Sequence, residues 1–128
     1  MVGSESAIYL DGLGKKVTMV EMQDDWAKDS YWMHKDAMKM YMKNSNIDIH
    51  VNTKAKEVTD EGLICITGDE EKLIKADTIL VAAGMSSRKD VALSFNNTAP
   101  RVSYIGDCMK PGRVAEAVSQ GHYKALDI

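Results

Sequence analysis

The sequence predicts an α/β fold in which helices pack on a parallel sheet and an antiparallel β-meander is inserted. Three patterns favour this class. Helical and strand-like segments alternate through residues 4–51, as they do in βαβ units. Short segments of alternating polarity follow in residues 53–75, which is typical of antiparallel strands. A nearly continuous apolar run then occupies residues 77–84, as expected of a parallel strand buried on both faces.

The first predicted elements are a helix and two strands. Apolar residues at helical spacing, followed by Gly12 and Gly14, predict a helix over residues 4–13. Apolar and β-branched residues predict strands over residues 16–21 and 47–51. These segments form the expected parallel part of the sheet.

A second helix is predicted over residues 32–43, after a polar loop at residues 23–30. Its apolar residues share one helical stripe, which is formed by Met33, Ala37, Met40 and Tyr41 and widened by Met38 and Met42. A methionine-rich stripe is also found on adaptable binding surfaces. We expect this one to pack in the core.

Three short strands are predicted next, over residues 53–59, 62–67 and 72–75. Two turn signals separate them, Asp60-Glu61-Gly62 and Gly68-Asp69-Glu70. Beyond the apolar run, we expect an irregular connection over residues 85–100 and a strand over residues 101–105. A turn at residues 106–107 and a final helix over residues 113–127 are expected to follow.

Composition excludes several function classes. The formal net charge is −3 and the isoelectric point is about 5.6, whereas nucleic acids and anionic membranes are bound by clustered positive charge. No apolar run approaches the roughly 20 residues of a membrane span, and no secretory signal is recognisable. We therefore expect a cytoplasmic protein without a nucleic-acid or membrane partner.

The chain opens with part of a dinucleotide-binding pattern. A βαβ nucleotide site has three glycines after its first strand and an acidic residue at the end of its second strand. Gly3 and Glu21 stand at suitable spacing for the last glycine and the acid, but the strand and the first two glycines are missing. We therefore expect a Rossmann-like fold that lacks its first strand, in a piece of a larger polypeptide.

The segment Gly3-Ser4-Glu5 begins the first predicted helix. Free backbone N–H groups and the positive end of the helix dipole favour a pyrophosphate at such a position. The alternative is an ordinary helix start, in which Ser4 caps the helix and Glu5 complements the dipole.

Glu21 indicates which dinucleotide the site would take. A carboxylate at the end of the second strand accepts hydrogen bonds from the adenosine ribose hydroxyls. It repels a 2′-phosphate, since two unit charges 4 Å apart cost about 4 kcal/mol at an effective dielectric constant near 20. No arginine follows closely to bind that phosphate. The sequence therefore predicts NADH rather than NADPH, with a solvated glutamate at the end of a strand as the alternative.

A similar arrangement occurs near the end of the chain. Ile105 is followed by Gly106 and Asp107, and a predicted helix begins at residue 113. An aspartate after a strand can bind sugar-like hydroxyls, and the amides that open the helix suit a flavin or a phosphate. The alternative is a capping aspartate in a tight turn.

The histidines and cysteines indicate no catalytic or metal site. His34, His50 and His122 lie on three different predicted elements without a nearby carboxylate or cysteine pattern, so we expect structural roles. Cys65 lies in a predicted strand as a buried, inert thiol, and Cys108 lies in a loop. No Cys-x-x-Cys pair is present, which leaves a disulfide reductase, a zinc site and an iron–sulfur site without support.

Four segments in order resemble the fold with two dinucleotide-binding domains that pyridine-nucleotide and flavin enzymes share. They are Val2-Gly3-Ser4-Glu5, residues 14–22, residues 76–84 and residues 102–108. The sequence is most similar to the carboxyl-terminal part of NADH:flavin oxidoreductases related to 2-enoate and 2,4-dienoyl-CoA reductases. It departs from that family at residues 84–88, where the family often carries a proline and an asparagine.

The resemblance implies two cofactor regions. Residues 1–97 would be most of an NADH-binding domain, and residues 98–128 would be the return segment of an FAD-binding domain. The residues that would line the NADH site are Gly3, Ser4, Glu21 and Gly84, with Glu5 near the nicotinamide end. Those that would contact FAD are Gly106, Asp107 and the backbone of Val114. None of them is implied to be catalytic.

The resemblance also implies the reaction of the whole enzyme. Hydride would pass from NADH to FAD, and electrons would then pass through an iron–sulfur cluster to FMN in a barrel that reduces an activated alkene. The FMN and the cluster would belong to a missing N-terminal part. The alternative is a non-catalytic adenine-nucleotide-binding or interaction domain with a vestigial site. For the 128-residue chain alone we expect poor NADH binding, no activity, and self-association through an exposed sheet.

Overall fold

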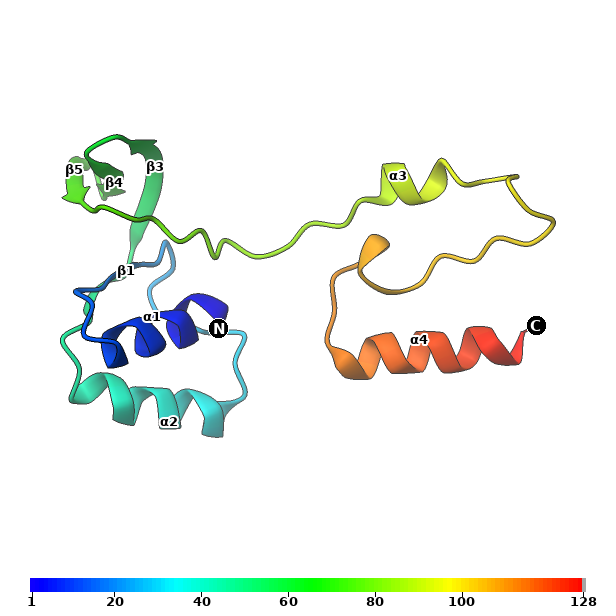
Figure 1. Ribbon diagram of the computed structural model, residues 1–128, viewed down its shortest axis with the longest axis horizontal. Helices are drawn as coiled ribbons and strands as arrows, with labels where there is room; N and C mark the ends of the chain where they lie inside the picture. Colours follow the sequence, from blue (N-terminus) through cyan, green and yellow to red (C-terminus); the bar gives the residue numbers. More distant parts are fainter. Residues whose placement is uncertain (128) are drawn as a thin grey trace. The chain divides into compact units, whose positions relative to one another are not determined.

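The structure is a computed structural model that describes residues 1–127. It divides into two compact units, Met1–Ala83 and the residues from Gly84 onward. The predicted division at residues 97–98 concerns cofactors rather than compactness, and it stays a prediction. The elements are α1 (Val2–Gly12), β1 (Thr18–Val20), α2 (Trp32–Lys43), β2 (Asp48–His50), β3 (Thr53–Thr59), β4 (Gly62–Thr67), β5 (Glu70–Lys75), α3 (Lys89–Leu93), the 3-10 turn η1 (Gly106–Cys108) and α4 (Val114–Leu126). Figure 1 labels all of them except β2 and η1.

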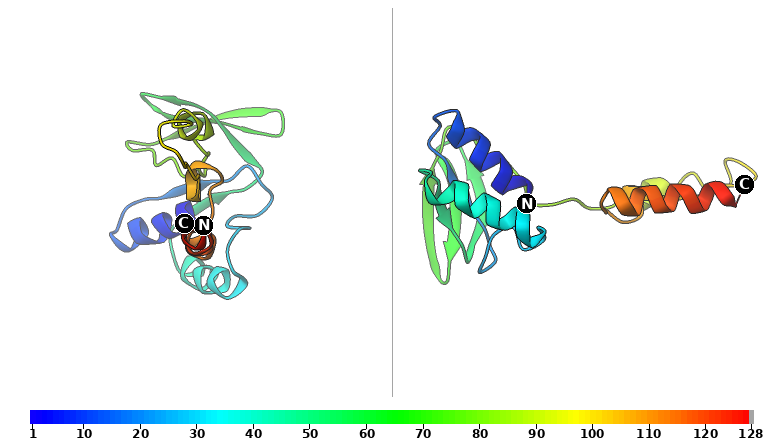
Figure 2. Two further views of the ribbon diagram at one scale, coloured as in Figure 1. Left: turned by 90° about the vertical axis from the view of Figure 1, so that its right-hand side faces the viewer. Right: turned by 90° about the horizontal axis from the view of Figure 1, so that it is seen from below.

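In the first unit, β1 and β2 form a parallel pair in which Met19 lies opposite Ile49. The helices α1 and α2 lie side by side and run in the same direction (Figures 1 and 2). In a βαβ unit, helices run against the strands, so their N-termini face the carboxyl ends of the strands. The predicted α/β class, with both parallel and antiparallel pairing, is confirmed.

The strands β3, β4 and β5 form the predicted antiparallel meander in sequential order. The turn before β4 depends on Gly62, whose φ is +142°. A Cβ at this position would lie 2.2 Å from the Ile74 carbonyl oxygen, so only glycine fits there. In β3 the register shifts between Ala55 and Glu57, which makes Lys56 the extra residue of a β-bulge.

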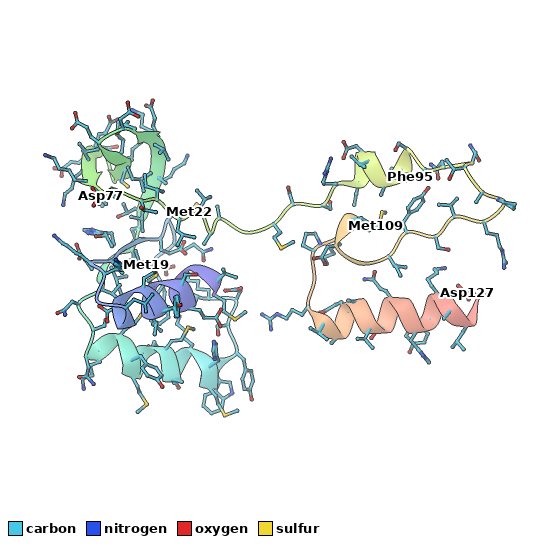
Figure 3. All side chains as sticks on the ribbon, viewed as in Figure 1. Met19, Met22, Asp77, Phe95, Met109 and Asp127 are labelled. Atoms are coloured by element: carbon cyan, nitrogen blue, oxygen red, sulfur yellow. The ribbon has the colours of Figure 1, made fainter. Side chains whose placement is uncertain are left out.

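The core of the first unit lies between the helices and the parallel pair. Trp26, Ala27, Met38 and Met42 are buried together, and partly buried side chains pack against them, namely Ile8, Met19, Ile47, Ile49 and Val51. Figure 3 labels Met19 at this position on β1. The loop predicted as polar therefore supplies two of the four central core residues.

The prediction that the apolar stripe of α2 packs in the core is wrong for most of its residues. Met33, Met40 and Tyr41 are 52%, 74% and 69% exposed, whereas Met38 and Met42 are 3% and 9% exposed. Positions 33, 40 and 41 fall on one side of a helix with 3.6 residues per turn, and positions 38 and 42 fall on the other. The helix has two apolar faces, and packing on α1 and the parallel pair selects the second.

Two predicted strands are absent from the described residues. Neither residues 77–84 nor residues 101–105 join a ladder within residues 1–127, and Leu80 and Val81 are 61% and 77% exposed. A strand requires a neighbour that accepts its backbone hydrogen bonds, and no described strand flanks either segment. The predicted irregular connection at residues 85–100 contains the short helix α3.

Candidate functional site

The carboxyl ends of β1 and β2 and the N-termini of α1 and α2 lie at one edge of the first unit, as the parallel topology requires. Ligands of open α/β sheets bind at this edge, outside the carboxyl ends of the strands. Glu21 and His50 stand at the ends of the two strands, and Glu5 and His34 stand in the first turns of the two helices. This edge is the candidate site of the first unit.

Glu21 is held firmly at this edge. Its backbone N–H donates to the His50 carbonyl oxygen at 2.8 Å, and its own carbonyl accepts the Thr53 N–H at 2.9 Å. Its Oε1 accepts the Gln23 backbone N–H at 2.9 Å. The carboxylate is therefore oriented by its own loop, and its second oxygen is left to accept a ligand hydroxyl.

Gly3 and Ser4 lie in the first turn of α1, and Gly3 lies close to Ala82. A Cβ at Gly3 would lie 3.2 Å from the Ala82 Cβ, closer than the 3.5–4.0 Å of an optimal carbon–carbon contact. Gly3 thus permits close packing of the helix on its neighbour, which is the role of the third glycine in the fingerprint. Ser4 is 3% exposed, so it presents little surface to a ligand.

Glu5 and His34 form a pair that the sequence reasoning missed. The Nε2 of His34, on α2, lies 2.9 Å from Oε1 of Glu5, on α1. His50 also has a carboxylate partner, Oδ2 of Asp48, at 2.9 Å from its Nε2. The expectation that these histidines lack nearby carboxylates is therefore wrong. A spacing of two residues along a strand could have revealed the second pair, whereas the first joins residues 29 positions apart.

The loop after Glu21 is fixed to α2 by Lys35. Its Nζ donates to Oδ2 of Asp25 at 2.5 Å and lies 5.4 Å from the centre of the Trp26 ring. The Lys35 side chain is only 13% exposed. The hydrogen bond from Lys35 lowers the pKa of Asp25 below its ordinary value, and this outweighs the opposing effect of burial. The ion pair and the cation–π contact together hold the loop.

The second unit contains the other predicted site residues. The Gly106 N–H donates to Oε1 of Gln120 at 2.6 Å, and Oδ1 of Asp107 accepts the Gly112 N–H at 3.1 Å. Gly106 has a φ of +72°, which glycine adopts without strain. Asp107 is exposed, so its carboxylate both closes the turn and remains open to a ligand.

The N-terminus of α4 is capped by Glu116. Its Oε2 accepts the Arg113 N–H at 2.9 Å, and hydrogen bonds from its own amide and from that of Arg113 lower its pKa. The first amides of a helix have no intrahelical acceptor. Val114, the first residue of α4, is 79% exposed, and its amide is one of those without an intrahelical acceptor. Gly84, with a φ of +92°, is exposed at the start of this unit.

An apolar groove of about 470 Å³ also lies in the second unit, between α3 and the segment 101–105. Figure 3 labels Phe95, which lines the groove together with Val91, Ala92, Val102, Tyr104 and Ile105. Among residues 1–127, no three side chains of the metal-binding types form a group. No helix in that range is long and apolar enough to cross a membrane.

Comparisons with known proteins match this arrangement. Residues 1–121 match the family described as pyridine nucleotide-disulphide oxidoreductase. The whole chain is 32% identical to 20% of a cinnamate reductase from Clostridium sporogenes. It is 30% identical to 20% of an NADH oxidase from Thermoanaerobacter brockii.

A solved structure is similar as well. A complex of 2-naphthoyl-CoA reductase with 2-naphthoyl-CoA superposes on 98% of this chain with a TM-score of 0.84 and 27% identity, over 19% of its own chain. The sequence thus spans about one fifth of the relatives that it matches.

Proposed function

The chain belongs to the pyridine nucleotide-disulphide oxidoreductase family, and we propose that it serves an NADH-dependent flavin oxidoreductase of the enoate-reductase type. In this proposal it binds NADH through its first part and contacts FAD through its last part. The relatives are oxidoreductases, among them a cinnamate reductase and an NADH oxidase. Because the chain spans about a fifth of their length, the activity of the whole protein belongs to this proposal.

The observation that carries the proposal is the placement of Glu21. An oriented carboxylate follows β1 at the ligand-binding edge of a parallel pair, in a chain whose relatives are redox enzymes. A carboxylate there binds ribose hydroxyls and disfavours a 2′-phosphate. This supports NADH over NADPH as the dinucleotide.

The NADH-binding part, in this proposal, covers residues 1–97. The close approach of Ala82 to Gly3 fits the packing that such a site needs. Glu21 binds the adenosine ribose, Gly3 lies along the dinucleotide, and Glu5 lies near its nicotinamide end. The N-terminus of α1 favours the pyrophosphate by its dipole.

The FAD-contacting segment, in this proposal, covers residues 98–128. The exposed carboxylate of Asp107 and the amide of Val114 at the start of α4 fit a polyhydroxylated chain and a flavin edge, with Gly106 permitting close approach. The two cofactors, when bound, would supply the chemistry of hydride transfer, with NADH as the donor and FAD as the acceptor. The chain's own residues orient the two cofactors. An FMN and an iron–sulfur cluster would be held by other parts of the enzyme.

The replacement Glu21→Ala tests the proposal. We expect NADH affinity to fall roughly tenfold, the value of a hydrogen-bonded charged group, and NADPH affinity to fall much less, because the repulsion also disappears. Titrations followed by amide NMR shifts measure weak affinities for both ligands. Glu57→Ala, which removes an exposed carboxylate of β3, should change neither.

Unchanged selectivity between NADH and NADPH in the Glu21→Ala chain would contradict the assignment of Glu21. In the full-length protein, ADP binding without NADH-dependent flavin reduction would favour a non-catalytic adenine-nucleotide domain instead. Flavin reduction by NADH would support the proposed oxidoreductase.

A further inference from the structure

The pair formed by Glu5 and His34 joins the two helices at the candidate site. Their Oε1 and Nε2 atoms lie 2.9 Å apart, and both side chains are close to half exposed. Glu5 is in the first turn of α1 and His34 is in the first turn of α2. Since both helices run in the same direction (Figure 1), the pair lies at the ligand-binding edge and not at the far side of the sheet.

The position of His34 is fixed from its own helix. The next residue, Lys35, is anchored to Asp25 and to the Trp26 ring, and Trp26 belongs to the core together with Met38. The first turn of α2 is therefore held by packing and by an ion pair. A side chain on a fixed helix turn can orient its partner, whereas one on a mobile loop cannot.

A carboxylate at the position of Glu5 needs to be oriented if a dinucleotide binds there. The N-terminus of α1 suits a pyrophosphate, and a carboxylate that turned toward that group would repel it. An imidazole N–H that holds the carboxylate prevents such a movement. The pair therefore affects the end of the ligand that Glu5 meets and not the adenosine end, where Glu21 lies.

We propose that His34 is a positioning residue of the dinucleotide site, which holds the Glu5 carboxylate toward the nicotinamide end of the ligand. This inference rests on the proposed function. It predicts different effects of His34 on the binding of NADH and of ADP-ribose, because ADP-ribose contains the adenosine and pyrophosphate parts but lacks the nicotinamide ring. His34 contributes to binding of the first ligand and not of the second.

Calorimetric titrations of the full-length protein with NADH and with ADP-ribose test the proposal. His34→Ala should weaken NADH binding about two- to fivefold, the range of an exposed charged pair, and leave ADP-ribose binding unchanged. His34→Gln keeps an N–H donor and should restore most of the NADH affinity. Adding His34→Ala to Glu5→Gln should cause little further loss.

The control is Lys39→Ala, which removes an exposed ion pair with Asp36 on the same helix and should change neither affinity. An unchanged thermal midpoint of each variant establishes that the core is intact. Equal weakening of both ligands by His34→Ala, or weakening of neither, would overturn the inference while the proposed function stands. If the unmodified full-length protein bound neither ligand, the proposed function itself would fail, and this inference with it.

Discussion

The two compact units differ in how they are held together. The first unit contains a buried cluster around Trp26 and Met38, five strands and the two packed helices α1 and α2. In the second unit the one buried residue among those described is Ala92, at 7% exposure. The apolar side chains of α4 are instead exposed, including Val118 at 64% and Leu126 at 71%. The first unit has a core, whereas the described residues of the second unit form none.

This difference shows that a match to the family does not depend on how well a segment is packed. The family match runs through both units, over residues 1–121. A segment can therefore match the family although its apolar side chains pack on no other layer among the described residues. Stability comes from burial of that face, so the two units should respond very differently to substitution.

The largest effect is expected from Met38→Ala, because Met38 is 3% exposed in the core of the first unit. Loss of a buried methionine side chain costs about 2–5 kcal/mol. Phe95→Ala in the second unit removes a side chain that is 57% exposed and should cost less than about 0.5 kcal/mol. Urea unfolding followed by tryptophan fluorescence measures the first variant, since both tryptophans, Trp26 and Trp32, lie in the first unit. Circular dichroism at 222 nm follows the second. Similar losses of unfolding free energy in the two variants would contradict the proposed difference between the two units.

The two cysteines offer a second test, one in each unit. Cys65 is 1% exposed, and burial raises the pKa of its thiol. Cys108 is partly exposed, and its Sγ donates to the Ile105 carbonyl oxygen at 3.1 Å. Alkylation of Cys65 requires local opening, so Cys108 should react on the order of a hundredfold faster. Mass spectrometry of the partly labelled chain measures both rates, and in urea they should become equal. Fast labelling of Cys65 in the folded chain would mean that the meander opens readily.

The smallest effect concerns pH and the helix α4. Hydrogen bonds from its own amide and from Arg113 lower the pKa of Glu116 below its ordinary value of 4.5. A carboxyl group with a lowered pKa in the folded state stabilises that state above its ordinary pKa, and this contribution is lost as the pH falls through the lowered value. Acidification below about pH 4.5 should therefore loosen the start of α4. Carbon chemical shifts of residues 114–117 report this change. In Glu116→Gln the shifts should lose this pH dependence, and a pH profile identical to that of the unmodified chain would contradict the role of the cap.

Local sequence signals predict most of the elements. The turns at residues 60–62 and 68–70 have strong chemical signatures, and both strand turns form where predicted. The helices α1, α2 and α4 are also predicted to within a few residues of their observed ends. These elements depend on interactions between near neighbours in the sequence, which a local pattern contains.

Sequence patterns fail to predict a feature when contacts with residues distant in the sequence determine it. Periodicity cannot choose between the two apolar faces of α2, because only packing on α1 and the parallel pair does so. An apolar run such as residues 77–84 becomes a strand only beside another strand. The pair of Glu5 and His34 is invisible for the same reason, since the loop and β1 between them determine whether they meet. In contrast, the place of Glu21 in the chain directly after β1 is predictable, because it follows from the strand pattern that precedes it.

The close contact between Gly3 and Ala82 has a consequence for how these positions can vary. A Cβ at residue 3 would stand 3.2 Å from the Ala82 Cβ, so the two positions share room for one methyl group. An alanine at position 3 would be accommodated if position 82 became glycine, and a valine at position 82 would require α1 to shift. The two residues therefore form a single volume constraint across 79 positions of chain, and their combined size limits how closely α1 approaches Ala82.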